Sequence, residues 1–273
     1  MRKSIGLLAM VLLVTAIMAL SLQSVGAADL KGTVNLVGST SVQPLAEELA
    51  KAFMTANPGV TITVAGGGSG AGIKAAQMGT ADIGTCSREL KPEEEAGITT
   101  TVIAKDGIAV IVNKRNRVTG LSLEQAAKIY TAQISNWSEV GGAKAPIILI
   151  SREAGSGTRG AFEELVLGKT PPTTNMLVQG STGAVRETIS VTPNAIGYMS
   201  LGDLDRTVKA LTINKVKPTQ NNVINKTYPL ARPFLFLTKG APQGLIKTFI
   251  DWVLSPAGQV IVAKNFVPIG KTR

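Results

Sequence analysis

The chain has 273 residues, a formal net charge of +10 and no histidine. The lack of histidine excludes a Ser-His-Asp triad and removes the usual general base and the usual zinc ligand. The basic surplus suits an anionic ligand, but nucleic acid is a poor candidate because the chain has no basic run and only 4% aromatic residues.

The single cysteine, Cys86, excludes an internal disulfide, so the hydrophobic core must provide the stability. Cys86 could be a reactive thiol, but we favour the interpretation that it is a small buried core residue. The sequence shows no cluster of metal-binding carboxylates, and we expect neither a metal nor a cofactor.

The first 28 residues are typical of a secretory signal peptide. Arg2 and Lys3 precede an apolar run from residue 5 to residue 20, and the small residues at 25–28 suit cleavage after Ala27 or Ala28. The alternative is an uncleaved membrane anchor, for which the apolar run is short. The prediction is an exported protein, periplasmic or on the extracellular face of the cytoplasmic membrane, whose mature chain keeps 26 basic and 18 acidic residues.

Apolar runs alternate with helical patterns along the rest of the chain. Strands are expected at 33–37, 60–64, 81–84, 108–112, 145–150, 195–199 and 230–238, and helices at 44–53, 70–76, 122–130, 158–166, 184–190 and after Gly244. This alternation predicts an α/β protein with mainly parallel sheets, in which ligands lie beyond the carboxyl ends of strands. The roughly 245 residues after the leader are enough for two lobes around one site.

Four clusters of glycine and hydroxyl residues lie at predicted strand-to-helix junctions, at 38–41, 66–72, 155–158 and 180–183. The free N–H groups and the dipole at a helix N-terminus attract an anion. Hydroxyls add donors, and Arg152 can offer a two-pronged charged contact. Each cluster alone could be a simple helix cap, but four with the same chemistry indicate one shared anion site.

Two nucleotide-binding motifs are excluded. Residues 155–160 match the G-x-G-x-x-G fingerprint, but no acidic residue follows about twenty positions later. The segments 168–170 and 270–272 resemble the end of a P-loop, yet residues 163 and 265 are not the required glycine.

Taken together, these segments resemble the phosphate-binding proteins of phosphate ABC transporters, a family of periplasmic substrate-binding proteins. The resemblance covers nearly all of the mature chain and rests on residues 38–44, 67–70, 81–84, 134–137, 152–158 and 195–198. It implies the type II periplasmic-binding-protein fold, with two lobes and a ligand cleft between them. Lobe 1 would take 29–106 plus 232–273 and lobe 2 would take 107–231, with the crossover strands at or beside 108–112 and 233–237.

The resemblance also implies which residues bind phosphate. They are Ser39, Thr40, Ser41, Ser69, Gly70, Ser87, Arg88, Arg152, Ser156, Gly157, Thr158 and Ser181. Well-known members carry an aspartate where this chain has Ser87 and Arg88, and that carboxylate accepts the proton of monohydrogen phosphate and repels sulfate. The preference for phosphate over sulfate therefore stays open, with Glu89 or Glu153 as possible substitutes, and Arg88 could equally be a surface ion-pair partner.

The function implied by the resemblance is binding without catalysis. The protein would capture inorganic phosphate as a monomer and deliver it to the membrane permease of an ABC transporter. One alternative is a carrier for another tetrahedral oxyanion such as sulfate, molybdate or tungstate. A less favoured one is an exported phosphatase that uses Ser156 or Thr158 as nucleophile, for which no histidine base exists.

Overall fold

The computed structural model describes residues 30–270, and the predicted signal peptide lies outside that range. The strands are β1 (Gly32–Gly38), β2 (Val60–Ala65), β3 (Ile83–Cys86), β4 (Ile98–Asn113), β5 (Gly120–Leu121), β6 (Ile148–Arg152), β7 (Leu177–Gln179), β8 (Ala195–Ser200), β9 (Val208–Ala210), β10 (Thr212–Ile213) and β11 (Ala231–Lys239). The α-helices are α2 (Gln43–Ala56), α3 (Ser69–Met78), α4 (Leu123–Tyr130), α5 (Gly157–Phe162), α6 (Thr182–Val191), α7 (Gln220–Ile224), α8 (Gly244–Leu254) and α9 (Pro256–Val262). A π-helix, η3 (Glu163–Leu167), continues α5, and three short 3₁₀ helices are η1 (Pro92–Glu94), η2 (Trp137–Val140) and η4 (Leu201–Asp203).

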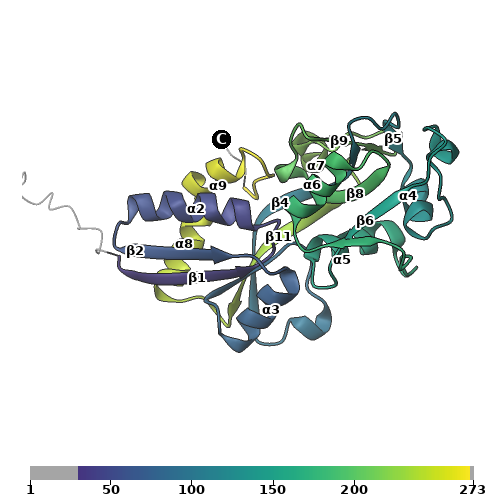
Figure 1. Cartoon of the computed structure of the whole chain (residues 1–273). Coiled ribbons are helices and arrows are strands. Elements are labelled where there is room, and N and C mark those ends of the chain that lie inside the picture. Colours follow the sequence, from purple (N-terminus) through teal and green to yellow (C-terminus); the bar gives the residue numbers. More distant parts are fainter. Residues whose placement is uncertain (1–29, 271–273) are drawn as a thin grey trace, which may run out of the picture.

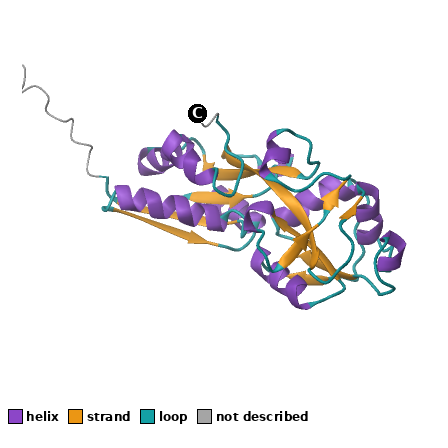
Figure 2. Cartoon of the chain, turned by 90° about the horizontal axis from the view of Figure 1, so that it is seen from above, coloured by secondary structure: helices purple, strands orange, loops and turns teal. Residues whose placement is uncertain are grey.

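Most strands belong to one path with the order β2-β1-β3-β11-β4-β8-β6-β7, and β9 lies beside β4. The outer strands are parallel, as the alternating sequence pattern predicts: β1 pairs with β2 and β3, and β6 pairs with β7 and β8. The central strands β11 and β4 are antiparallel to their neighbours. Helices flank the strands in both halves of the molecule (Figure 2), and the mixed α/β prediction is confirmed.

The two largest hydrophobic cores are built by different elements, which lie in opposite halves of the molecule in Figure 1. One core packs α2, α8 and α9 around residues such as Phe53 and Phe249, and we call this half the first lobe. The other core contains Tyr130, Phe162 and Tyr198, and we call this half the second lobe. Burying an aromatic or aliphatic side chain contributes about 1.5–3 kcal/mol to the stability of the fold. Each lobe is therefore stabilised by a core of its own.

Strands β4 and β11 run through both lobes. Ile103 of β4 packs in the first core and Ile108 of the same strand packs in the second. Between them, Asp106 is in register with Arg232 of β11. Both side chains are buried, and Arg232 Nη2 lies 2.9 Å from Asp106 Oδ2. A buried ion pair therefore marks the position where the two strands pass from one lobe to the other.

Several elements follow the expected sequence signals. Ser122 caps α4, with its Oγ accepting from the N–H of Gln125 at 3.0 Å. Gly79, with a left-handed φ of +72°, ends α3. Within residues 30–270, no single helix is long and apolar enough to cross a membrane, and only α8 and α9 together, bent by 64°, have the length and composition to do so.

The sequence did not predict the first half of β4, from Ile98 to Gly107. Polar residues, among them Lys105 and Asp106, interrupt its apolar pattern, so the pattern predicts no strand there. Its long pairing with β11 holds it as a strand nevertheless. The short elements β5, β7, β9, β10 and α7 were also not predicted, since two to five residues carry too little periodicity.

Candidate functional site

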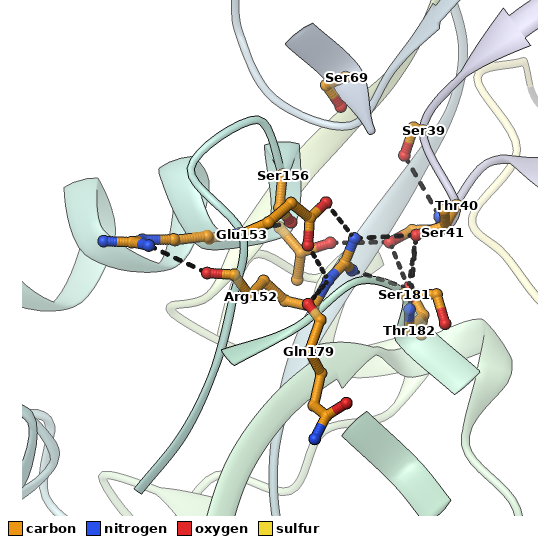
Figure 3. Close-up of polar contacts among 12 residues, drawn as sticks. Ser39, Thr40, Ser41, Ser69, Arg152, Glu153, Ser156, Gln179, Ser181 and Thr182 are labelled. Carbon is orange, nitrogen blue, oxygen red and sulfur yellow. Dashed lines mark hydrogen bonds and ion pairs between the residues drawn. The ribbon is translucent and has the colours of Figure 1, made fainter. Parts of the chain in front are cut away.

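The four predicted glycine and hydroxyl clusters meet where the two lobes face each other (Figure 3). Ser41 Oγ of the first lobe lies 2.7 Å from Thr158 Oγ1 and 3.0 Å from Thr182 Oγ1 of the second. The backbone N–H of Gly70 donates to the carbonyl of Gly155 at 2.9 Å. Clusters that are up to 142 positions apart in the chain therefore form one polar site.

Arg152, at the end of β6, occupies the centre of this site and is only 2% exposed. Its Nη2 donates to Thr40 Oγ1 of the first lobe at 3.0 Å, and its Nη1 donates to Thr182 Oγ1 at 3.3 Å. The Glu153 carboxylate receives two further bonds, from Nε at 2.9 Å and from Nη2 at 2.8 Å. Figure 3 shows the guanidinium between this carboxylate and the hydroxyls, so the buried positive charge is balanced and oriented.

One side of the site consists of the buried serines Ser39, Ser69 and Ser87, which we call the serine wall. Ser39 Oγ donates to Ser87 Oγ at 2.9 Å, and the N–H of Ser87 donates to Ser69 Oγ at 3.1 Å. Arg232 lies behind this wall, and its Nη1 donates to the carbonyl of Ser87 at 3.2 Å and to Ser87 Oγ at 3.3 Å. The ion pair at the crossover is thus connected to the serine wall.

The helix N-termini supply further donors. Ser156 caps α5, because its Oγ accepts from the N–H of Arg159 at 3.2 Å. Gly157 follows, and a Cβ atom there would overlap with Ser69 Oγ and lie 2.7 Å from Ser87 Oγ. Glycine at this position lets α5 approach the first lobe closely. The N-termini of α2, α3, α5 and α6 therefore border the same polar site.

The structure brings together most of the residues that the sequence singles out. They are Ser39, Thr40, Ser41, Ser69, Gly70, Ser87, Arg152, Ser156, Gly157 and Thr158. Ser181 caps α6, since its Oγ accepts from the N–H of Ala184 at 3.1 Å. Its neighbour Thr182 supplies the side chain that contacts Arg152 and Ser41.

Arg88 lies in a different setting. Its guanidinium makes two bonds to Glu94, at 2.6 Å and 2.8 Å, and its Nη1 also donates to the carbonyl of Glu89. The hydrogen bond from Arg88 lowers the pKa of the Glu94 carboxyl. The ion-pair interpretation of Arg88 therefore agrees with its contacts.

Three contributors were not predicted from the sequence: Thr182, Arg232 and its partner Asp106. Thr182 belongs to the predicted cluster at 180–183, in which the resemblance implies Ser181 as the ligand residue. Arg232 offers only a weak indication of a site residue: it is a cation at the start of an apolar strand, directly before Pro233. Nothing local in the sequence joins it to Asp106.

Cys86, next to the serine wall, is fully buried, and burial raises the pKa of its thiol. This agrees with the core interpretation. In the part of the chain between residues 30 and 270, no three His, Cys, Asp or Glu side chains could hold a metal ion together. Hydroxyl and N–H donors and a central guanidinium, which is paired with the Glu153 carboxylate, dominate the site, and this chemistry suits an oxyanion.

Comparison with known proteins gives concordant matches. The family model for the PBP superfamily domain matches residues 24–257. The phosphate-binding protein PstS of Bacillus subtilis (strain 168) is 34% identical over 246 residues, which cover 87% of this chain and 81% of that protein. PstS of Borreliella burgdorferi is 31% identical over 250 residues, which cover 87% of this chain and 90% of that one.

A solved structure is also similar. It is a Clostridium perfringens protein described as a phosphate ABC transporter substrate-binding protein and solved with bound phosphate. It matches with a TM-score of 0.85 and 44% identity, and the match covers 88% of this chain and 100% of that chain.

Proposed function

We propose that this chain, which belongs to the PBP superfamily and within it to the PstS phosphate-binding proteins, binds inorganic phosphate between its two lobes for uptake by an ABC transporter. The observation that carries the proposal is the convergence of four helix N-termini and the buried Arg152 on one polar site. Phosphate is a compact anion with four oxygens, and such a set of converging donors matches it.

Both lobes would contribute to binding. The first lobe offers the hydroxyls of Thr40 and Ser41, and the second offers Arg152 and Thr158. Hydroxyls that contact one another in the structure can each turn a proton toward a phosphate oxygen. Hydrogen bonds to a charged group contribute about 1.5–3 kcal/mol each, so four to six of them would support micromolar or tighter binding, which needs about 8 kcal/mol.

The boundary between the lobes would lie at the ion pair of Asp106 and Arg232. The first lobe would then be residues 30–106 plus 232–270, and the second 107–231, because β4 and β11 change cores at these positions. An anion that contacts both lobes stabilises the closed arrangement through contacts that an open one lacks.

The physiological partner would be the membrane permease of a phosphate ABC transporter, which would take phosphate from the closed protein. This role needs an exported protein, as the signal peptide pattern of residues 1–28 predicts. Binding without turnover is supported by the absence of histidine from the sequence, since Ser156 and Thr158 would have no histidine base to activate them.

Titration calorimetry of the purified protein with phosphate tests this function. Saturable one-to-one binding is expected, and Arg152→Gln should weaken it at least about a hundredfold, which corresponds to about 2.7 kcal/mol. Arg88→Gln is the matched control: its guanidinium is engaged by Glu94, and its loss should change the affinity little. Absence of phosphate binding, or steady hydrolysis of a phosphate ester, would contradict the proposal.

A further inference from the structure

The hydroxyl of Ser87 is fully buried and receives two hydrogen bonds. Arg232 Nη1 donates to its Oγ at 3.3 Å, and Ser39 Oγ donates to it at 2.9 Å. A hydroxyl has two lone pairs and one proton, and a guanidinium can only donate. Since both lone pairs are occupied, the Ser87 proton must itself be donated to another group.

Ser69 continues this chain of donors. Its Oγ accepts from the N–H of Ser87 at 3.1 Å and lies 3.4 Å from Ser87 Oγ. If it also accepts the Ser87 proton, both its lone pairs are occupied. Ser69 then has a proton to donate, and its Oγ lies next to Gly157 of the other lobe.

The geometry of Arg232 fixes the direction of this chain. Its Nε and Nη2 both donate to Asp106 Oδ2, at 3.1 Å and 2.9 Å. This arrangement leaves Nη1 to point at Ser87. Arg232 therefore acts on the site through Ser87 and has no need to touch the ligand.

Arg152 has the same effect on the hydroxyl of Thr40, which is not part of the serine wall. Thr40 Oγ1 accepts from Arg152 Nη2 at 3.0 Å and from the N–H of Thr182 at 3.4 Å. Its proton must also be donated, and Thr182 Oγ1, 3.5 Å away, is one group that can accept it. Two buried arginines, Arg232 behind the serine wall and Arg152 at the centre of the site, thus direct these hydroxyls to act as donors.

Two carboxylates, Asp106 and Glu153, lie close to these hydroxyls, and each accepts hydrogen bonds from an arginine. Asp106 Oδ2 accepts from Arg232, and both oxygens of Glu153 accept from Arg152. Asp106 Oδ1 is buried and has no hydrogen-bond partner among residues 30–270. We propose that Arg232 is a positioning residue that makes the hydroxyls of Ser87 and Ser69 act only as hydrogen-bond donors. The site then binds dianionic tetrahedral oxyanions whether or not they carry a proton. This inference rests on the proposed function and specifies its ligand class: monohydrogen phosphate and sulfate alike.

Calorimetry at about pH 6 and about pH 8.5, with phosphate and with sulfate, tests the inference. Sulfate should bind within about tenfold of phosphate at the higher pH, a difference of about 1.4 kcal/mol or less. Phosphate affinity should rise with pH as the dianion becomes more abundant, and sulfate affinity should stay nearly constant.

Variants of Ser87 give a matched pair. Ser87→Asp introduces an acceptor and should weaken sulfate at least about tenfold more than phosphate. Ser87→Ala removes the hydroxyl without adding an acceptor and should weaken both anions by a similar factor. A double variant, Arg232→Met with Asp106→Leu, frees Ser87 to accept and should raise the phosphate-to-sulfate ratio, with thermal unfolding as the check on folding.

Tight phosphate binding that a hundredfold excess of sulfate leaves unchanged would overturn the inference and leave the proposed function intact. Loss of that discrimination in Glu153→Gln would then identify Glu153 as an acceptor, which also contradicts a donor-only site. If the protein binds neither anion, the proposed function fails and the inference fails with it.

Discussion

Arg232 joins the crossover between the lobes to the wall of the anion site: its Nη2 lies 2.9 Å from Asp106 Oδ2, and its Nη1 lies 3.2 Å from the carbonyl of Ser87. Asp106 and Arg232 face each other at the position where β4 and β11 change cores. One guanidinium therefore contacts both the carboxylate at the crossover and a serine of the candidate site.

Asp106→Asn should destabilise the protein by about 3–5 kcal/mol, because it removes the carboxylate that is hydrogen-bonded to the buried Arg232. Burial raises the pKa of Asp106 and Arg232 opposes that rise, so each charge depends on the other. Denaturant unfolding at neutral pH measures the effect. The control is Asp251→Asn, whose partner Lys247 is 58% exposed; it should cost less than about 1 kcal/mol. Equal effects of the two variants would argue against a structural role for the buried pair.

Gly157→Ala should weaken phosphate binding at least about tenfold, or about 1.4 kcal/mol. The added Cβ would overlap with Ser69 Oγ and lie 2.7 Å from Ser87 Oγ, so the two lobes could not approach as closely. Gly155→Ala is the control in the same loop, since a Cβ there meets nothing within 4 Å. Calorimetry of both variants checks the prediction, which would be wrong if they bound phosphate equally well.

Thr182→Val and Ser181→Ala should separate binding from capping. Valine keeps the shape of Thr182 but removes the oxygen that contacts Arg152 and Ser41, so we expect a loss of about 1.5–3 kcal/mol in phosphate binding. Ser181→Ala should instead cost about 1 kcal/mol of stability, because it removes the cap of α6. Measuring both quantities for both variants tests the assignment, and reversed effects would return the ligand role to Ser181.

The sequence predicts much of this site because its signals are local. Glycine and hydroxyl residues at a strand-to-helix junction, with Arg152 beside them, indicate an anion site without any knowledge of the fold. The choice between Ser181 and Thr182 depends on backbone angles at the start of α6, which the sequence does not reveal. The pairing of Arg232 with Asp106 joins residues 126 positions apart, and the polar residues around Asp106 hide the strand that carries it.

Asp203 should make stability depend on pH. Burial, and then the negative charge of Asp106, raise its pKa from 3.8 to about 7, against the opposing charges of Arg232 and Arg186. Asp203 Oδ2 has no hydrogen-bond partner among residues 30–270. Between about pH 4 and pH 7 the folded protein therefore holds a proton that the unfolded chain has lost. Stability should fall as pH rises through this window, by up to about 1.4 kcal/mol per pH unit.

Asp203→Asn removes this titration and should be more stable than the unsubstituted protein at pH 8, with a flatter profile between pH 4 and pH 7. Denaturant unfolding over that range measures the slope. Asp205→Asn is the control of opposite sign, because hydrogen bonds from Thr207 lower the Asp205 pKa. The stability that Asp205 contributes is present above about pH 4 and is lost only as pH falls further. An unchanged slope in Asp203→Asn would show that Asp203 is already ionised in the folded protein, where Arg232 and Arg186 would have to balance its charge as well as that of Asp106.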